Sequence, residues 1–146
     1  MLHLIQTLGD KLLDLLSQDP IRPHIPASDR VGDNKVIFVL RNEHDEVRAI
    51  TCVSYQSSIP ASEQELFNVE AEPDTAVFYT IWSYKPGAGK ELIFDAVRYI
   101  KENNKNITKF VTLSPKTEMA KRFHTKNGAV IFRENAETTN YQYLDR

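Results

Sequence analysis

The chain has 146 residues, of which 41% are hydrophobic and 26% charged, and its formal net charge is -2. These values are typical of one globular domain with its own core, so we expect residues 1–146 to form a single domain. They exclude a fibrous or low-complexity chain and a whole-domain basic field for nucleic acid. No apolar run approaches the roughly 20 residues that span a bilayer, so we expect no membrane partner.

Cysteine usage bounds the chemistry further. Cys52 is the one cysteine, which excludes an internal disulfide and a zinc site of several thiolates. It stands in an alternating apolar run, so we expect a buried, inert side chain in a reduced, cytoplasmic setting. We expect no metal.

The first half of the chain contains one predicted helix and a hairpin. Leucines and isoleucines recur at three- and four-residue steps over residues 2–17, which predicts an amphipathic helix. Three prolines then predict a loop over 19–33. Lys35–Arg41 and Val47–Gln56 are rich in Val and Ile and flank the polar turn Asn42–Glu46, so we expect an antiparallel hairpin.

The second half alternates strands and helices. Thr75–Ser83 is almost entirely apolar or aromatic, which predicts a central strand covered on both faces. A looser segment over 57–73 precedes it, with a short helical piece at Glu63–Phe67. The elements expected after it are a glycine-bearing turn (Tyr84–Lys90), a helix (Glu91–Asn103), a strand (Lys109–Leu113), a helix (Thr117–Lys126) closed by Asn127-Gly128, and a final hairpin (Ala129–Arg133 and Thr138–Leu144).

The segment from the central strand through the glycine turn into the helix is an anion-binding device. Small residues let the backbone approach a ligand, and the first helical amides and the helix dipole favour a phosphate. The turn reads Lys85-Pro86-Gly87-Ala88-Gly89-Lys90, with a lysine on each side of the glycines.

Three ligands compete for this turn. A nucleotide P-loop needs a glycine where Tyr84 stands and a Ser or Thr where Glu91 stands, which argues against it. A dinucleotide fingerprint needs a third glycine, and Phe94 follows instead. The third candidate is the pyrophosphate of coenzyme A.

Two motifs in order favour coenzyme A: the turn Tyr84–Gly89 and the later run Ala120–Ala129. With them, the run from Thr75 to Tyr143 resembles the GNAT acyltransferase superfamily. Tyr84–Gly89 keeps both glycines of that family's Arg/Gln-x-x-Gly-x-Gly/Ala turn but has Tyr84 at the leading position. Ala120–Ala129 fits its second frame, Ala-x-x-Phe/Leu-Tyr-x-x-x-Gly-Phe, with His124 at the tyrosine position.

The resemblance implies an α+β fold, a mixed and mostly antiparallel central sheet flanked by helices, whose central strand splays from its neighbour at the cofactor site. It implies acetyl-CoA or another acyl-CoA as cofactor, an amine acceptor and a possible homodimer. For Lys85 and Lys90, solvated surface charge competes with phosphate binding. The cofactor-binding residues that it implies are Ile81, Trp82, Ser83, Lys85, Gly87, Ala88, Gly89, Lys90, Ser114, Thr117 and Phe123.

The implied reaction is transfer of an acetyl group to an amine of a small molecule or protein. His124 would protonate the departing thiolate as general acid. The central strand contains no glutamate, so the base candidates are Glu72 and Tyr79, with Asp74, Glu70 and His44 beside them. Because Tyr84 and His124 depart from the family pattern, a non-catalytic acyl-CoA-binding or regulatory domain is the alternative.

Overall fold

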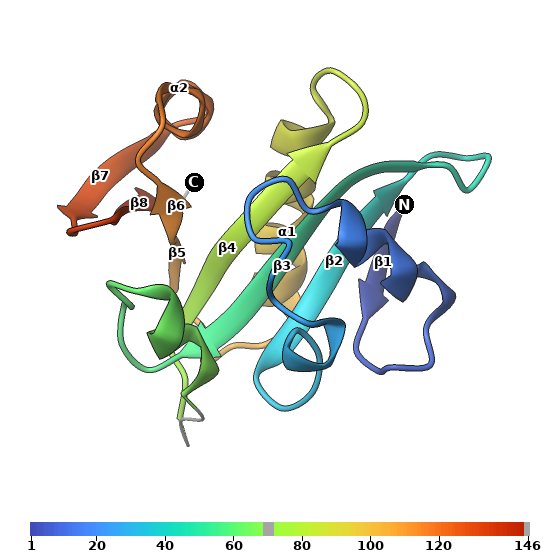
Figure 1. The fold of residues 1–146 in the computed structure, drawn as a ribbon, viewed down its shortest axis with the longest axis horizontal. Helices are drawn as coiled ribbons and strands as arrows, with labels where there is room; N and C mark the ends of the chain where they lie inside the picture. Colours follow the sequence, from blue (N-terminus) through green and yellow to red (C-terminus); the bar gives the residue numbers. More distant parts are fainter. Residues whose placement is uncertain (69–71, 145–146) are drawn as a thin grey trace.

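A mixed sheet forms the centre of the protein in the computed structural model, which describes residues 1–68 and 72–144 (Figure 1). Its strand order is β1-β2-β3-β4-β5-β8-β6, and β7 pairs with β8. The strands are β1 (Leu2–Ile5), β2 (Lys35–Arg41), β3 (Val47–Gln56), β4 (Thr75–Ser83), β5 (Lys109–Thr112), β6 (Ser114–Pro115), β7 (Ala129–Glu134) and β8 (Thr138–Tyr143). All pairs of neighbouring strands are antiparallel except β4 and β5. The predicted fold class is confirmed.

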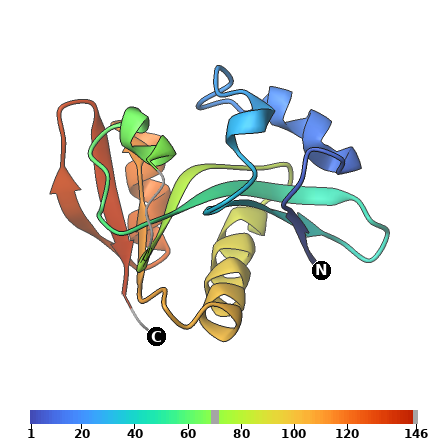
Figure 2. The same ribbon diagram turned by 90° about the horizontal axis from the view of Figure 1, so that it is seen from below.

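The two faces of the sheet are covered differently (Figure 2). Helix α1 (Ala88–Asn103) packs on one face, where Phe38, Phe78 and Ile93 share a core cluster. Three 3-10 segments, η1 (Lys11–Gln18), η2 (Ala27–Asp29) and η3 (Glu63–Phe67), and the loops around them cover the other face. The predicted central strand, β4, is therefore buried from both sides, as expected.

The predicted helix over residues 2–17 is wrong. Leu2–Ile5 form strand β1, which pairs with the edge of β2, and the helical turns begin only at Lys11. Leu2 and Leu4 pack against the α1 side of the sheet, whereas Leu12 and Leu16 pack against the opposite side. The leucine spacing satisfied a helical pattern, but an unpaired strand edge of β2 offered main-chain hydrogen bonds that a local pattern does not reveal.

The other predicted elements are confirmed with shifts of a few residues. Helix α1 begins at Ala88 rather than Glu91, because Gly87 adopts a left-handed conformation (φ 79°) and acts as its N-cap. Helix α2 spans Glu118–Lys126, and the Thr117 side chain caps it by accepting from the Ala120 amide at 3.1 Å. Cys52 is fully buried, and burial raises the pKa of its thiol to about 11.

Strands β4 and β5 separate half-way along β4. They pair in register from Thr75 with Lys109 to Phe78 with Thr112, and the Leu113 amide donates to the Phe78 carbonyl at 3.0 Å. On the other edge of β4 the register with β3 shifts, since Val53 pairs with Phe78 and Cys52 with Thr80. Tyr79 is therefore an extra residue in β4, a β-bulge, and bulges bend the strand that carries them. The predicted splay of the central strand follows from this geometry.

Candidate functional site

The separation of β4 from β5 opens a cleft of about 650 Å³. One wall is β4 from Phe78 to Ser83, and the other is formed by the loop after β5 and by helix α2. Pro20 and Ile21 close one side, and Gly89 of α1 contributes to the opposite side. None of the described side chains that line it is an Asp, Glu, Lys or Arg, so this lining is apolar with a few uncharged polar groups.

The cleft brings together most of the residues singled out from the sequence. They are Tyr79, Ile81, Trp82, Ser83, Gly89, Ser114, Thr117, Phe123 and His124. Lys85 and Lys90 are exposed at the turn, and Lys90 Nζ lies 5.9 Å from the Phe94 ring centroid. Gly87 and Ala88 belong to the same turn but do not line the cleft.

The start of α1 has the form of a phosphate cradle at the end of this cleft. Of the first-turn amides, that of Ala88 donates to the Lys85 carbonyl and that of Glu91 to the Gly87 carbonyl, both at 3.2 Å. The remaining two amides of this first turn are those of Gly89 and Lys90, and first-turn amides have no acceptor within a regular helix. A Cβ atom on Gly89 would lie 3.0 Å from the Phe123 ring, so glycine here lets the two helices approach closely.

His124 is the histidine of the cleft, and it is only 3% exposed. Its Nδ1 lies 2.7 Å from the Tyr143 hydroxyl, and its ring stacks on Tyr141 at 5.0 Å between centroids. Burial lowers its pKa to about 4, so the imidazole is neutral at pH 7. When Tyr143 donates to Nδ1, the ring proton resides on Nε2, which has no hydrogen-bond partner among the described residues.

Ser114, which also lines the cleft, belongs to a chain of buried polar groups. The Ser114 hydroxyl donates to Thr112 Oγ1 at 2.8 Å, and Thr112 Oγ1 also accepts from the Tyr141 amide at 3.1 Å. Asn140 donates to the Thr112 carbonyl at 2.8 Å, which connects β8 to the end of β5, just before Ser114. These bonds hold the loop after β5 open from β4, which maintains the width of the cleft.

Known proteins resemble this chain in structure and not in sequence. No protein-family model and no curated protein sequence matches the chain. Among solved structures, a malonyl-CoA decarboxylase from Rhodopseudomonas palustris matches 99% of this chain and 59% of its own length, with a TM-score of 0.76 and 18% identity. GCN5 from Tetrahymena matches 99% of this chain and 96% of its own (TM-score 0.64, 13% identity), and an acetyltransferase from Bacillus subtilis in complex with CoA matches 99% and 97% (TM-score 0.62, 17% identity).

The chain has a GNAT fold. It spans less than two thirds of the decarboxylase that it matches, and nearly the whole of the two acetyltransferases. Within this GNAT fold, the cleft lies where one strand pair of the sheet comes apart, and the glycine turn lies at one end of that cleft.

Of the residues proposed from the sequence as general bases, those that the structure describes either have a raised pKa through burial or lie away from the cleft. Tyr79 lines it, but its hydroxyl is buried without a hydrogen-bond partner among the described residues, and burial raises its pKa well above 10. Glu72 is exposed before the start of β4, and Asp74 binds Thr75 and Lys109 at the same end, away from the cleft. His44 is exposed in the β2–β3 turn. Glu70 lies outside the described residues.

Tyr84, which replaces the leading residue of the family turn, points to the amino-terminal segment instead. Its hydroxyl donates to Gln18 at the end of η1 and accepts from the Trp82 indole at 3.0 Å. This contact links the glycine turn to the segment that covers the opposite face of the sheet.

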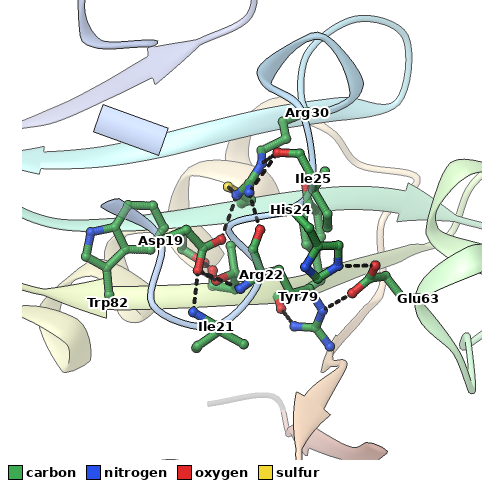
Figure 3. A network of polar contacts seen from close by, with 12 residues as sticks. Asp19, Ile21, Arg22, His24, Ile25, Arg30, Glu63, Tyr79 and Trp82 are labelled. Carbon is green, nitrogen blue, oxygen red and sulfur yellow. Dashed lines mark hydrogen bonds and ion pairs between the residues drawn. The ribbon is translucent and has the colours of Figure 1, made fainter. Parts of the chain in front are cut away.

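The loop over 19–30 makes buried polar contacts with β4 that the sequence did not predict (Figure 3). Asp19 and Arg30 form a fully buried ion pair at 2.7 Å, and Asp19 also accepts from the Thr80 hydroxyl on β4 at 2.9 Å. Arg22 reaches the bulge itself, since its Nη1 donates to the Tyr79 carbonyl. The prolines of this segment predict a loop, and no local pattern predicts its contact with β4.

In the described residues no helix is long and apolar enough to cross a membrane. The same part of the chain holds no group of three or more His, Cys, Asp and Glu side chains arranged to bind a metal ion.

Proposed function

We propose that the cleft binds an acyl-CoA, with its pyrophosphate at the start of α1 and its pantetheine arm along β4. The glycine turn supports this, because first-turn amides and the helix dipole favour a phosphate. The unpaired edge of β4 beyond Phe78 supports it too, since it offers backbone groups to an amide-bearing arm. The acyl group would then lie near the bulge at Tyr79, between β4 and His124.

For the reaction, we propose decarboxylation of a malonyl-type thioester. The observation that carries this proposal is that His124 is buried in a cleft whose described lining has no charged side chain. With a pKa of about 4, roughly one molecule in a thousand carries an imidazolium at pH 7. A transferase needs an acid for the departing thiolate and a path for the amine's proton, whereas a decarboxylase keeps the thioester intact.

The proposed decarboxylation balances in atoms and electrons. The bond between the carboxyl carbon and the α-carbon breaks, CO₂ leaves, and the electron pair remains on the thioester enolate. One proton from solvent then adds to the α-carbon and gives the acetyl thioester. A neutral His124 with its proton on Nε2 would donate a hydrogen bond to the enolate oxygen, where charge develops. The higher TM-score of the decarboxylase, 0.76 against 0.64 for GCN5, is in line with this choice.

Transfer of an acetyl group to an amine is the second candidate. It is supported by the match over nearly the whole of GCN5 and by the two sequence motifs. In that reaction a water chain would have to deprotonate the amine, because no carboxylate lines the cleft in the part of the chain that the structure describes.

One paired assay separates these functions. The purified protein is incubated with malonyl-CoA alone, and in parallel with acetyl-CoA and a panel of amines, while acetyl-CoA is followed by chromatography and free thiol by a colorimetric reagent. Acetyl-CoA formed from malonyl-CoA without any amine supports decarboxylation, and amine-dependent thiol release supports transfer. A rise in melting temperature with CoA but no product indicates a binding domain. No shift with any CoA ester at saturating concentration refutes the cleft assignment.

The matched variants are His124→Ala and His44→Ala. The first removes the proposed hydrogen-bond donor and should lower product formation by about 100-fold or more while CoA still binds. The second removes an exposed loop histidine and should leave turnover unchanged. Equal turnover in both variants would exclude His124 from the reaction.

A further inference from the structure

A second, smaller cavity adjoins the cleft at the bulge. It has a volume of about 370 Å³ and shares Ile21 and Pro115 with the cleft. Its lining includes Arg22, whose guanidinium binds the carbonyl of the bulge residue Tyr79. A group attached to a thioester at the bulge would therefore extend towards this cavity.

Arg22 is a buried cation, and some of its N–H groups have no acceptor among the described residues. Its side chain is 6% exposed, and a guanidinium carries five N–H donors. Nε donates to Glu63 Oε1 at 2.9 Å and Nη1 donates to the Tyr79 carbonyl, so two donors are used (Figure 3). The other three have no acceptor in the part of the chain that the structure describes, although Arg22 lines the cavity.

The two carboxylates near Arg22, those of Glu63 and Glu137, do not occupy its remaining N–H groups. Glu63 uses its second oxygen to bind His24 at 2.6 Å, so both of its oxygens are engaged. Glu137 also lines the cavity, but it is exposed and its charge is screened by solvent. A planar carboxylate fits an Arg side chain better than other anions of its size because two N–H groups can bind its two oxygens.

We infer that Arg22 selects acyl chains that end in a carboxylate, by binding that carboxylate in the smaller cavity. The inference rests on the proposed binding of an acyl-CoA and names its substrate class. It also explains how a decarboxylase could prefer its substrate to its product, because the acetyl group has no carboxylate for Arg22. Since this contact is lost as CO₂ forms, it stabilises the bound substrate and not the transition state.

Binding of three probes to the wild-type protein tests this directly: CoA, succinyl-CoA and isovaleryl-CoA. Succinyl-CoA carries a terminal carboxylate but is not a β-keto acid, so it stays intact, and isovaleryl-CoA is a neutral ester with the branched shape of malonyl-CoA. Calorimetry should show succinyl-CoA binding on the order of 10- to 100-fold more tightly than isovaleryl-CoA. Equal affinities would overturn the inference while leaving acyl-CoA binding intact. Failure of CoA itself to bind would refute the proposed function instead.

Variants assign the preference to Arg22. Arg22→Met should abolish the preference for succinyl-CoA and keep the affinity for CoA, which also reports that the variant is folded. Arg22→Lys keeps the charge and should retain part of the preference, and Arg98→Met alters an exposed arginine on α1 as the control. With malonyl-CoA, Arg22→Lys should raise KM more than it lowers kcat. A preference that persists in Arg22→Met would refute the role of Arg22.

Discussion

The burial of His124 makes a testable prediction about stability at low pH. The pKa of this side chain is about 4 in the folded protein, against 6.5 for an unperturbed histidine. Because its folded pKa is depressed, the unfolded chain binds more protons below pH 6.5, so stability falls as the pH falls through that value. The loss is complete below the folded pKa of about 4.

The magnitude follows from the two pKa values. Between about pH 7.5 and about pH 5, protonation of His124 in the unfolded state should cost about 2 kcal/mol of folding free energy. Groups that wild type and variant share contribute equally in both proteins. Although burial opposes them, hydrogen bonds from Arg22 and Arg30 lower the pKa of Asp19, so Asp19 titrates below this range. A comparison of wild type with a His124 variant cancels those shared contributions.

The assay is urea unfolding of wild type, His124→Gln and His44→Gln at both pH values. His124→Gln should lose about 2 kcal/mol less than wild type between the two conditions. His44→Gln should follow the wild type, because His44 is 75% exposed in its turn. Parallel pH dependence of wild type and His124→Gln would show that His124 is not held neutral in the fold, and would remove the main support for decarboxylation.

Three further predictions concern the surroundings of the cleft. Arg30→Met leaves Asp19 buried without its partner and should cost about 3–5 kcal/mol of unfolding free energy by urea titration, against less than about 0.5 kcal/mol for Arg98→Met; similar costs would contradict the burial of the pair. Gly87→Ala places a side chain at φ 79° and should cost about 1–2 kcal/mol, and an unchanged stability would contradict that conformation. Cys52 should resist a thiol reagent in the native protein and react after unfolding, whereas rapid native labelling would contradict its burial.

Several parts of the candidate site could be predicted because their signals are local. The glycine turn and α2 each have a characteristic order of residues, and the apolar composition of β4 predicted a strand covered on both faces. These elements converge on one cleft, which contains nine of the residues named from the sequence. The role of His124 was less accessible, since its low pKa depends on burial beneath Tyr141 and Tyr143.

The sequence by itself determined the elements whose stability depends on neighbours along the chain: the β2–β3 hairpin, helix α1, helix α2 with its caps, and the closing β7–β8 hairpin. Tertiary structure decided what depends on distant partners. Leu2–Ile5 became a strand because β2 had a free edge, and Arg22 lies beside the bulge because the buried Asp19–Arg30 pair holds its loop against β4. The glycine turn therefore predicted a ligand class from local residues, whereas the contacts of the 19–30 loop, which bring Arg22 to the bulge, are long-range and have no local pattern in the sequence.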